Sequence, residues 1–126
     1  MDWVAWRAKA IAALGSELGT YTDMNGATSP ALAIDPNEIP GRTVAGLEVV
    51  VDTSEGVAYS GQFSSYYLEI THRITLKQWT QGATTTAALR LLLPLLHPNP
   101  VIGTRIPANS RIGNIETQSI TFTEVA

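Results

Sequence analysis

The chain has 126 residues, a formal charge of −3 and no cysteine, and its length suits one domain. Its apolar fraction of 44% and its charged fraction of 15% exclude an intrinsically disordered chain. The acidic balance excludes the basic surface typical of nucleic-acid-binding proteins, and the lack of cysteine fits folding in a reducing cytoplasm. No apolar run is long enough to span a membrane.

The N-terminal segment predicts an amphipathic helix. Asp2 is a residue type that caps helices, and apolar residues recur at helical spacing to about Leu18. Arg7 lies within the apolar arc, so its charge must reach solvent along the side chain, pair with a carboxylate or contact another chain. Residues 20–43 are punctuated by glycine and proline and predict a long loop, a feature that in compact domains is often functional or ordered by a partner.

A hairpin is predicted next. Residues 47–51 form a β-branched run, and the turn-forming residues 52–56 separate it from a short return strand at 57–60. Asp52 and Glu55 are therefore expected at a solvated hairpin tip.

The clearest pattern is the alternation of apolar and polar residues over 66–78, which predicts one half-buried strand. This strand is roughly twice the usual length, so we expect it to project beyond its sheet as an arm or a shared edge. Tyr67, Arg73 and Lys77 lie on its polar face, and Trp79 follows its end.

The C-terminal third predicts a helix and a last strand. The helix begins near Thr84, ends near Leu93, and is apolar over more of its circumference than one sheet face buries. The first helix, a loop or another subunit must cover the excess. In the last strand, over 114–125, the apolar positions change parity near Gln118, which predicts a bulge or a later strand start. The element order predicts an α+β domain: a mainly antiparallel sheet, two helices packed on one face, and a long protruding hairpin or strand.

Few residues offer chemistry. His72 and His97 have no metal-binding spacing, and no serine lies in a nucleophile motif. Glu69 and His72 fall on opposite faces of one strand, which argues against a catalytic pair. The sequence therefore predicts no enzyme, no cofactor and no metal site.

Residue types that anchor protein interfaces are better represented. The candidates are Arg7, Tyr67, Arg73, Lys77, Trp79, Arg105 and Arg111. Each has a plainer interpretation, as an ordinary exposed charge for the arginines or as a core residue at the strand end for the tryptophan. Residues 1–63 hold eight acidic and three basic residues, whereas 64–126 hold three acidic and five basic ones. This uneven distribution of charge between the two halves favours stacking on copies of the chain or on partners.

The stretch 67–79 (Tyr-Leu-Glu-Ile-Thr-His-Arg-Ile-Thr-Leu-Lys-Gln-Trp), the Thr/Ala/Leu-rich helix after it and the stretch 105–122 resemble tail terminator, or tail completion (neck), proteins of long-tailed bacteriophages. The resemblance implies that residues 1–126 form one domain, which assembles into a ring, usually hexameric. That ring caps the tail-tube protein and joins the tube to the head connector. It also implies a location in the tail or neck of the virion after assembly in the host cytoplasm, with DNA passing through the lumen and no membrane involved.

The same resemblance makes residues of both matching stretches interface candidates, and it implies no catalytic residue. Those candidates are Arg73, Lys77, Trp79, Arg105 and Arg111. Asp52 and Glu55 are expected to line or rim the pore of the ring. Two alternatives stay open: a head-completion or connector adaptor at the portal, and a small ligand-binding α+β domain or enzyme. A closed pocket with converging polar groups favours the last of these.

Overall fold

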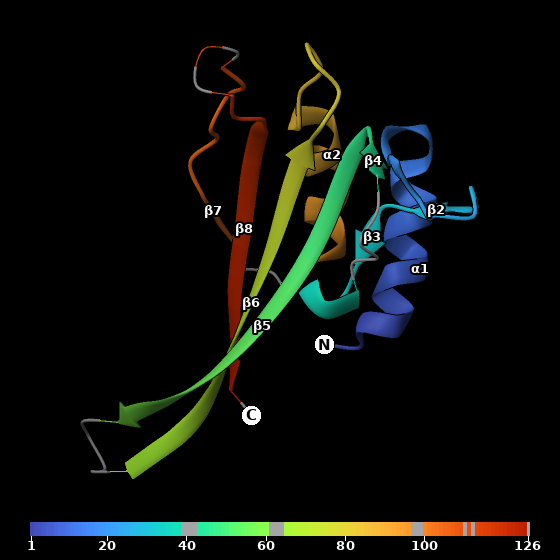
Figure 1. Cartoon of the computed structure of the whole chain (residues 1–126). Helices are drawn as coiled ribbons and strands as arrows, with labels where there is room; N and C mark the ends of the chain where they lie inside the picture. The colour runs from blue at the N-terminus through green and yellow to red at the C-terminus, as the bar shows by residue number, and fades with distance from the viewer. Residues whose placement is uncertain (39–42, 61–64, 97–99, 110, 112, 126) are drawn as a thin grey trace.

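Two helices cover one face of a five-stranded sheet, so the fold is α+β (Figure 1). The computed structural model describes residues 1–38, 43–60, 65–96, 100–109, 111 and 113–125. The helices are α1 (Trp3–Leu14) and α2 (Thr86–Leu92). The sheet has the order β3-β5-β6-β8-β7, with β3 (Leu32–Ala33), β5 (Leu47–Ser60), β6 (Ser65–Gln78), β7 (Val101–Ile102) and β8 (Glu116–Val125). Its neighbouring strands are antiparallel except for β3 and β5.

Helix α1 begins where the sequence predicts. The Asp2 carboxylate accepts the Ala5 N–H at 3.2 Å and caps the first turn. Gly15, with a φ of 52°, ends the helix after Leu14, and the turn η1 (Gly15–Glu17) follows. The predicted extension to Leu18 is therefore a separate 3₁₀ turn, because the left-handed backbone at Gly15 breaks the helix.

The core lies between the helices and the inner face of the large sheet. Odd positions of β5 and even positions of β6 and β8 face inward, as the alternation requires. The buried core residues are Trp6, Ala10, Leu14, Leu32, Leu47, Val49, Val51, Ile74, Leu76, Ala88, Leu92, Ile120 and Phe122. Strand β8 pairs in regular register from Glu116, so the later start accounts for the parity change and no bulge is present in its pairing with β6.

The expectation of a loop over residues 20–43 is wrong for the described part of that segment. A second, antiparallel sheet has the order β2-β1-β4, with β1 (Thr20–Thr22), β2 (Thr28–Pro30) and β4 (Thr43–Ala45), and the turn η2 (Pro36–Glu38) follows β3. Strands of two or three residues are too short to show a period in the sequence. Gly19 joins the two sheets: its N–H donates to the Leu47 carbonyl at 2.8 Å, and a Cβ there would overlap the Ala45 carbonyl oxygen.

The predicted turn at residues 52–56 is also wrong. Strand β5 runs through it, pairing with β6 in unbroken register from Leu47↔Gln78 to Ser60↔Ser65. The polar side chains that look like a turn are tolerated because they are exposed in the strand. Residues 61–64, which connect β5 and β6, lie outside the described residues.

The paired strands confirm a long protruding hairpin (Figure 1). Pairing of β6 with β8 ends at Glu69↔Val125, and beyond it β5 and β6 continue together as a curved two-stranded ribbon, shown in green and yellow-green (Figure 1). We call residues 55–60 and 65–70 the arm.

Candidate protein interface

Three of the predicted interface residues lie on the outer face of the large sheet, away from the helices. Tyr67, Arg73 and Lys77 share the outward parity of β6. Arg73 is exposed and lies directly opposite Asp52 of β5, whereas Lys77 is half-buried opposite Glu48. The alternation in the sequence correctly assigned all three to one face.

The expectation that Asp52 and Glu55 lie at a hairpin tip is wrong. Both side chains are exposed, but they lie within β5 on opposite faces of the sheet. Asp52 shares the outer face with Arg73, whereas Glu55 lies on the helix side, opposite Ile70. Because strand residues of unlike parity point to opposite faces, these two carboxylates face opposite sides of the sheet, and their position at the rim of a pore stays a prediction.

Trp79 contributes to the structure as well as to the surface. Its indole N–H donates to Glu48 Oε1 at 3.2 Å, and the Tyr21 hydroxyl donates to Glu48 Oε2 at 2.7 Å. Glu48 is buried, so its carboxylate depends on these donors. Burial, helped by the Glu48 hydrogen bond, raises the pKa of Tyr21 well above its ordinary value, so the phenol remains a donor at neutral pH. The indole is still 45% exposed and available for contact.

Sequence reasoning missed the role of Glu48. The available signal was one acid inside the apolar run of residues 47–51, a position that an unpaired carboxylate rarely occupies. Arg7, the predicted interface residue on α1, is half-buried, and its positive charge opposes the rise in the pKa of Tyr21. Arg7 therefore lies within electrostatic reach of this buried cluster in its own chain.

The two C-terminal arginines lie in the connection between β7 and β8. Arg105 Nε is 3.8 Å from the buried carboxylate of Glu116, which also accepts the Thr85 N–H at 2.5 Å. Arg111 is exposed in a turn that Asn109 stabilises by accepting the Arg111 N–H at 3.0 Å. Both arginine side chains are thus at least partly exposed in the connection between β7 and β8.

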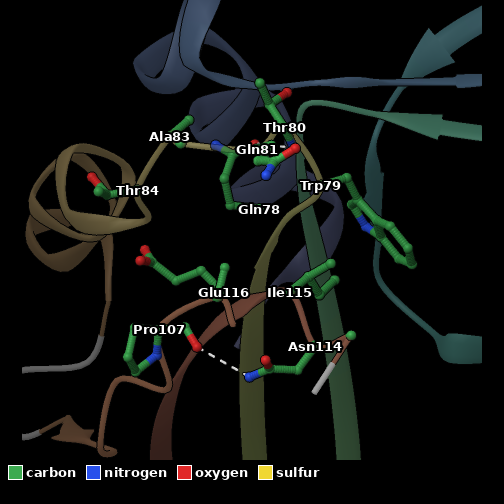
Figure 2. Close-up of a pocket in the computed structure, with 13 residues that line it drawn as sticks. Gln78, Trp79, Thr80, Gln81, Ala83, Thr84, Pro107, Asn114, Ile115 and Glu116 are labelled. Atoms are coloured by element: carbon green, nitrogen blue, oxygen red, sulfur yellow. Dashed lines mark hydrogen bonds between the residues drawn. The ribbon is translucent and has the colours of Figure 1, made fainter. Parts of the chain in front are cut away.

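A cavity of about 600 Å³ opens beside this loop, between residues 78–84 and 107–116 (Figure 2). Three of the polar side chains that line it have partners within the chain. Asn114 donates to the Pro107 carbonyl at 3.0 Å, Gln78 accepts the Thr80 N–H at 3.0 Å, and Glu116 is paired as described (Figure 2). These three side chains are therefore already engaged within the chain and are less free to recognise a small ligand.

His72 is buried in a hydroxyl–imidazole–carboxylate chain. Its Nδ1 lies 3.0 Å from Thr53 Oγ1, and its Nε2 lies 2.8 Å from Glu124 Oε2. The His72 hydrogen bond holds the pKa of Glu124 below its ordinary value. Neither the cavity above nor the smaller one beside Leu18 and Pro30 borders this group. The cluster ties β5, β6 and β8 together near the base of the arm.

The exposed apolar surface lies mainly away from α2. Leu92 is fully buried and Leu91 is 39% exposed, so most of the apolar excess predicted for this helix is covered within the chain. Met24 and Val4 are the most exposed, at 90% and 83%, and further large apolar side chains are exposed on the arm and along the β7 edge of the sheet. They are Val57, Tyr66, Tyr67 and Leu68 on the arm, and Val101, Ile102 and Ile106 at the edge.

Among the described residues, no three histidine or acidic side chains are grouped to hold a metal ion. No helix in the described part of the chain combines the length and the apolar character needed to cross a membrane. Comparison with models of protein families, with curated proteins and with solved structures finds no match to this chain. Function is therefore inferred from the chain's own surfaces.

Proposed function

We propose that this chain is a structural protein of the phage tail or neck that assembles into a ring, hexameric by resemblance. The ring caps the tail tube, joins it to the head connector and lets DNA pass through its lumen without specific binding. The observation that carries the proposal is the arm, whose large apolar side chains Val57, Tyr66 and Leu68 are exposed in the single chain. Exposed apolar surface of this kind marks sites of protein contact.

The distribution of surfaces supports a ring. A closed ring of identical subunits uses two different surfaces of each copy, one on either side. This chain offers an apolar arm at one end of its long strands and an apolar, arginine-bearing edge near the other (Figure 1). The outer sheet face adds Tyr67, Arg73 and Lys77, residue types suited to a further contact with the tube or the connector.

Two alternatives share some of these features. A head-completion or connector adaptor at the portal also forms a ring, and its binding partner distinguishes it from a tail terminator. A small ligand-binding domain is favoured by the cavity near Glu116, but Glu116 and Asn114 are both hydrogen-bonded within the chain.

The proposal is tested by mass photometry and negative-stain imaging of the purified chain, alone and mixed with the tail-tube protein from the same genome. We expect rings, either in solution or at the end of tubes, and tubes that stop growing when the chain is added. A chain that stays monomeric and has no affinity for the tube protein overturns the proposal. Rings that bind a portal or connector protein but not the tube favour the adaptor.

A further inference from the structure

The arm carries an apolar surface that continues the core face of the sheet beyond its cover. Val57 and Leu68 are directly opposite each other, and Tyr66 and Ile70 share their face. This is the face that α1 and α2 cover where β5 and β6 reach the core. On the arm, Val57 is 72% exposed, Tyr66 is 71% exposed and Leu68 is 39% exposed. We call Val57, Tyr66, Leu68 and Ile70 the arm strip.

The arm strip has acidic surroundings. Residues 53–71 contain two glutamates, Glu55 and Glu69, and no lysine, arginine or histidine. Glu55 lies on the same face as the arm strip, opposite Ile70. A partner that covers the strip therefore also places its own charge next to Glu55, and a basic partner is favoured.

The β7 edge has the complementary character. Val101 is 67% exposed, Ile102 is 48% exposed and Ile106 is 54% exposed. Residues 101–115 contain two arginines, Arg105 and Arg111, and no acid. Arg105 is also 3.8 Å from the buried Glu116 carboxylate, and its side chain is still 45% exposed. Val101 and Ile106 lie opposite the outward residues Thr121 and Thr117, whereas Ile102 lies opposite the core residue Ile120, so this edge is apolar on both faces of the sheet. We call Val101, Ile102, Arg105 and Ile106 the edge surface.

The edge surface is held in place by backbone hydrogen bonds to β8. Ile106 and Thr117 exchange two bonds of 2.9 Å, and the Gly103 N–H donates to the Ser119 carbonyl at 2.8 Å. Among the described residues, strand β7 is the outermost strand of the sheet, next to β8. A partner that arrives at this edge therefore meets a preformed surface and little ordering is needed on binding.

The two surfaces of one chain are too far apart along the sheet to meet each other. Val101 pairs with Thr121, and Thr121 pairs with Arg73, so these three residues lie at the same height along the strands. The arm strip begins three residues further along β6, at Ile70, and extends in the direction away from Arg73. The separation from Arg73 to Leu68 is about 17 Å along the strand. Figure 1 shows the arm curving away at one end while the β7–β8 connection lies towards the other.

We propose that the arm strip of one copy docks on the edge surface of the next copy, with Glu55 facing Arg105 across the contact. This inference rests on the proposed function and supplies the contact between ring neighbours. Two different surfaces joined head to tail give a heterologous interface, which closes into a ring when its rotation allows. Docking covers apolar side chains on both copies and brings an acidic segment to a basic one.

Charge-reversal variants test this contact. They are measured under the conditions in which the wild type forms rings, either in solution or on the tail tube. We expect Glu55→Arg and Arg105→Glu each to weaken assembly at least tenfold, measured by sedimentation velocity over a range of concentrations. The double variant restores assembly, and Glu17→Arg, the same charge change at an exposed residue of η1, leaves it unchanged. Single variants that assemble like the wild type, or a double variant that does not recover, overturn the inference.

Mixing two defective chains tests the head-to-tail arrangement. One chain carries Val57→Asp and Leu68→Asp on the arm, and the other carries Ile102→Asp and Ile106→Asp at the edge. Each is expected to be monomeric alone, with unchanged circular dichroism and melting, because these side chains are exposed. Mixed together they form one heterodimer through the single intact arm and the single intact edge. Homodimers of the edge-defective chain would instead show that arm binds arm, which overturns the inference.

The outcomes separate this inference from the proposed function. Wild-type rings that persist in the arm and edge variants reject the contact and leave the ring-forming function standing. Rings that need both surfaces but bind no tube protein reject the tail function and leave the contact standing. A wild-type chain that forms no assembly under any of these conditions rejects both.

Discussion

The two halves of the β5–β6 hairpin have the same alternating pattern but opposite surroundings. In the half under the helices, the inward residues Val49, Val51, Ile74 and Leu76 are completely buried. On the arm, residues of the same parity are largely exposed, with Val57 at 72%. The alternation thus shows which face of a strand is apolar, whereas the elements packed above that face decide whether it is buried in the chain or available to a partner.

Truncating one leucine in each half of the hairpin tests this difference in burial. We expect Leu76→Ala to lower the free energy of unfolding by about 2–5 kcal/mol, because it leaves a cavity in the core. Leu68→Ala is expected to change it by less than about 0.5 kcal/mol in the monomer, since an exposed side chain loses little packing. Chemical denaturation measures both. Equal losses at the two positions would show that the arm strip is covered within its own chain.

Tyr21, which bonds the buried carboxylate of Glu48, and the exposed Tyr67 provide a second comparison, with a smaller expected effect on stability. Tyr21→Phe removes the 2.7 Å hydrogen bond and leaves Glu48 with fewer donors, so we expect a loss of about 1–3 kcal/mol in unfolding free energy. Tyr67→Phe, at the exposed arm, is the matched control and is expected to have little effect on the monomer. Urea unfolding measures the two variants, and a Tyr21→Phe protein as stable as the wild type would contradict this role.

We predict that the contact at the base of the arm makes the stability of the fold depend on pH, and we expect this to be the smallest of these effects. Because the His72 hydrogen bond lowers the pKa of Glu124 in the folded chain, the ionised carboxylate stabilises the fold above its unfolded pKa. This contribution is lost as the pH falls through the lower, folded pKa. We expect Glu124→Gln to flatten the decline in stability at acidic pH, measured by thermal unfolding from pH 7 to pH 3, while Glu17→Gln does not. Identical profiles for the wild type and Glu124→Gln would contradict this contribution.

Local signals predicted much of the fold. Asp2 gave the start of α1, and alternation over 66–78 gave β6, its outer face and its projection beyond the sheet. What local signals could not show depends on distant pairing. The short strands of residues 20–45 are defined by their neighbours, and β5 continues through residues 52–56 because β6 supplies an unbroken partner.

The candidate sites show the same division. The outward faces of Tyr67, Arg73 and Lys77 follow from strand parity alone. The contact of Glu48 with Tyr21, and that of His72 with Glu124, join residues far apart in the sequence and have no spacing that marks them. The sequence left Trp79 open as either a core residue or an interface residue, and the structure shows features of both. Its indole N–H donates to the buried Glu48, while 45% of the side chain remains exposed.

Sedimentation velocity of the wild-type chain beside Leu68→Asp, each with tail-tube protein and alone, tests the central claim most directly. The account predicts that the wild type sediments as a closed ring and that the variant sediments as a folded monomer with the same melting temperature. A wild type that remains monomeric throughout, or a variant that forms the same ring, would contradict it.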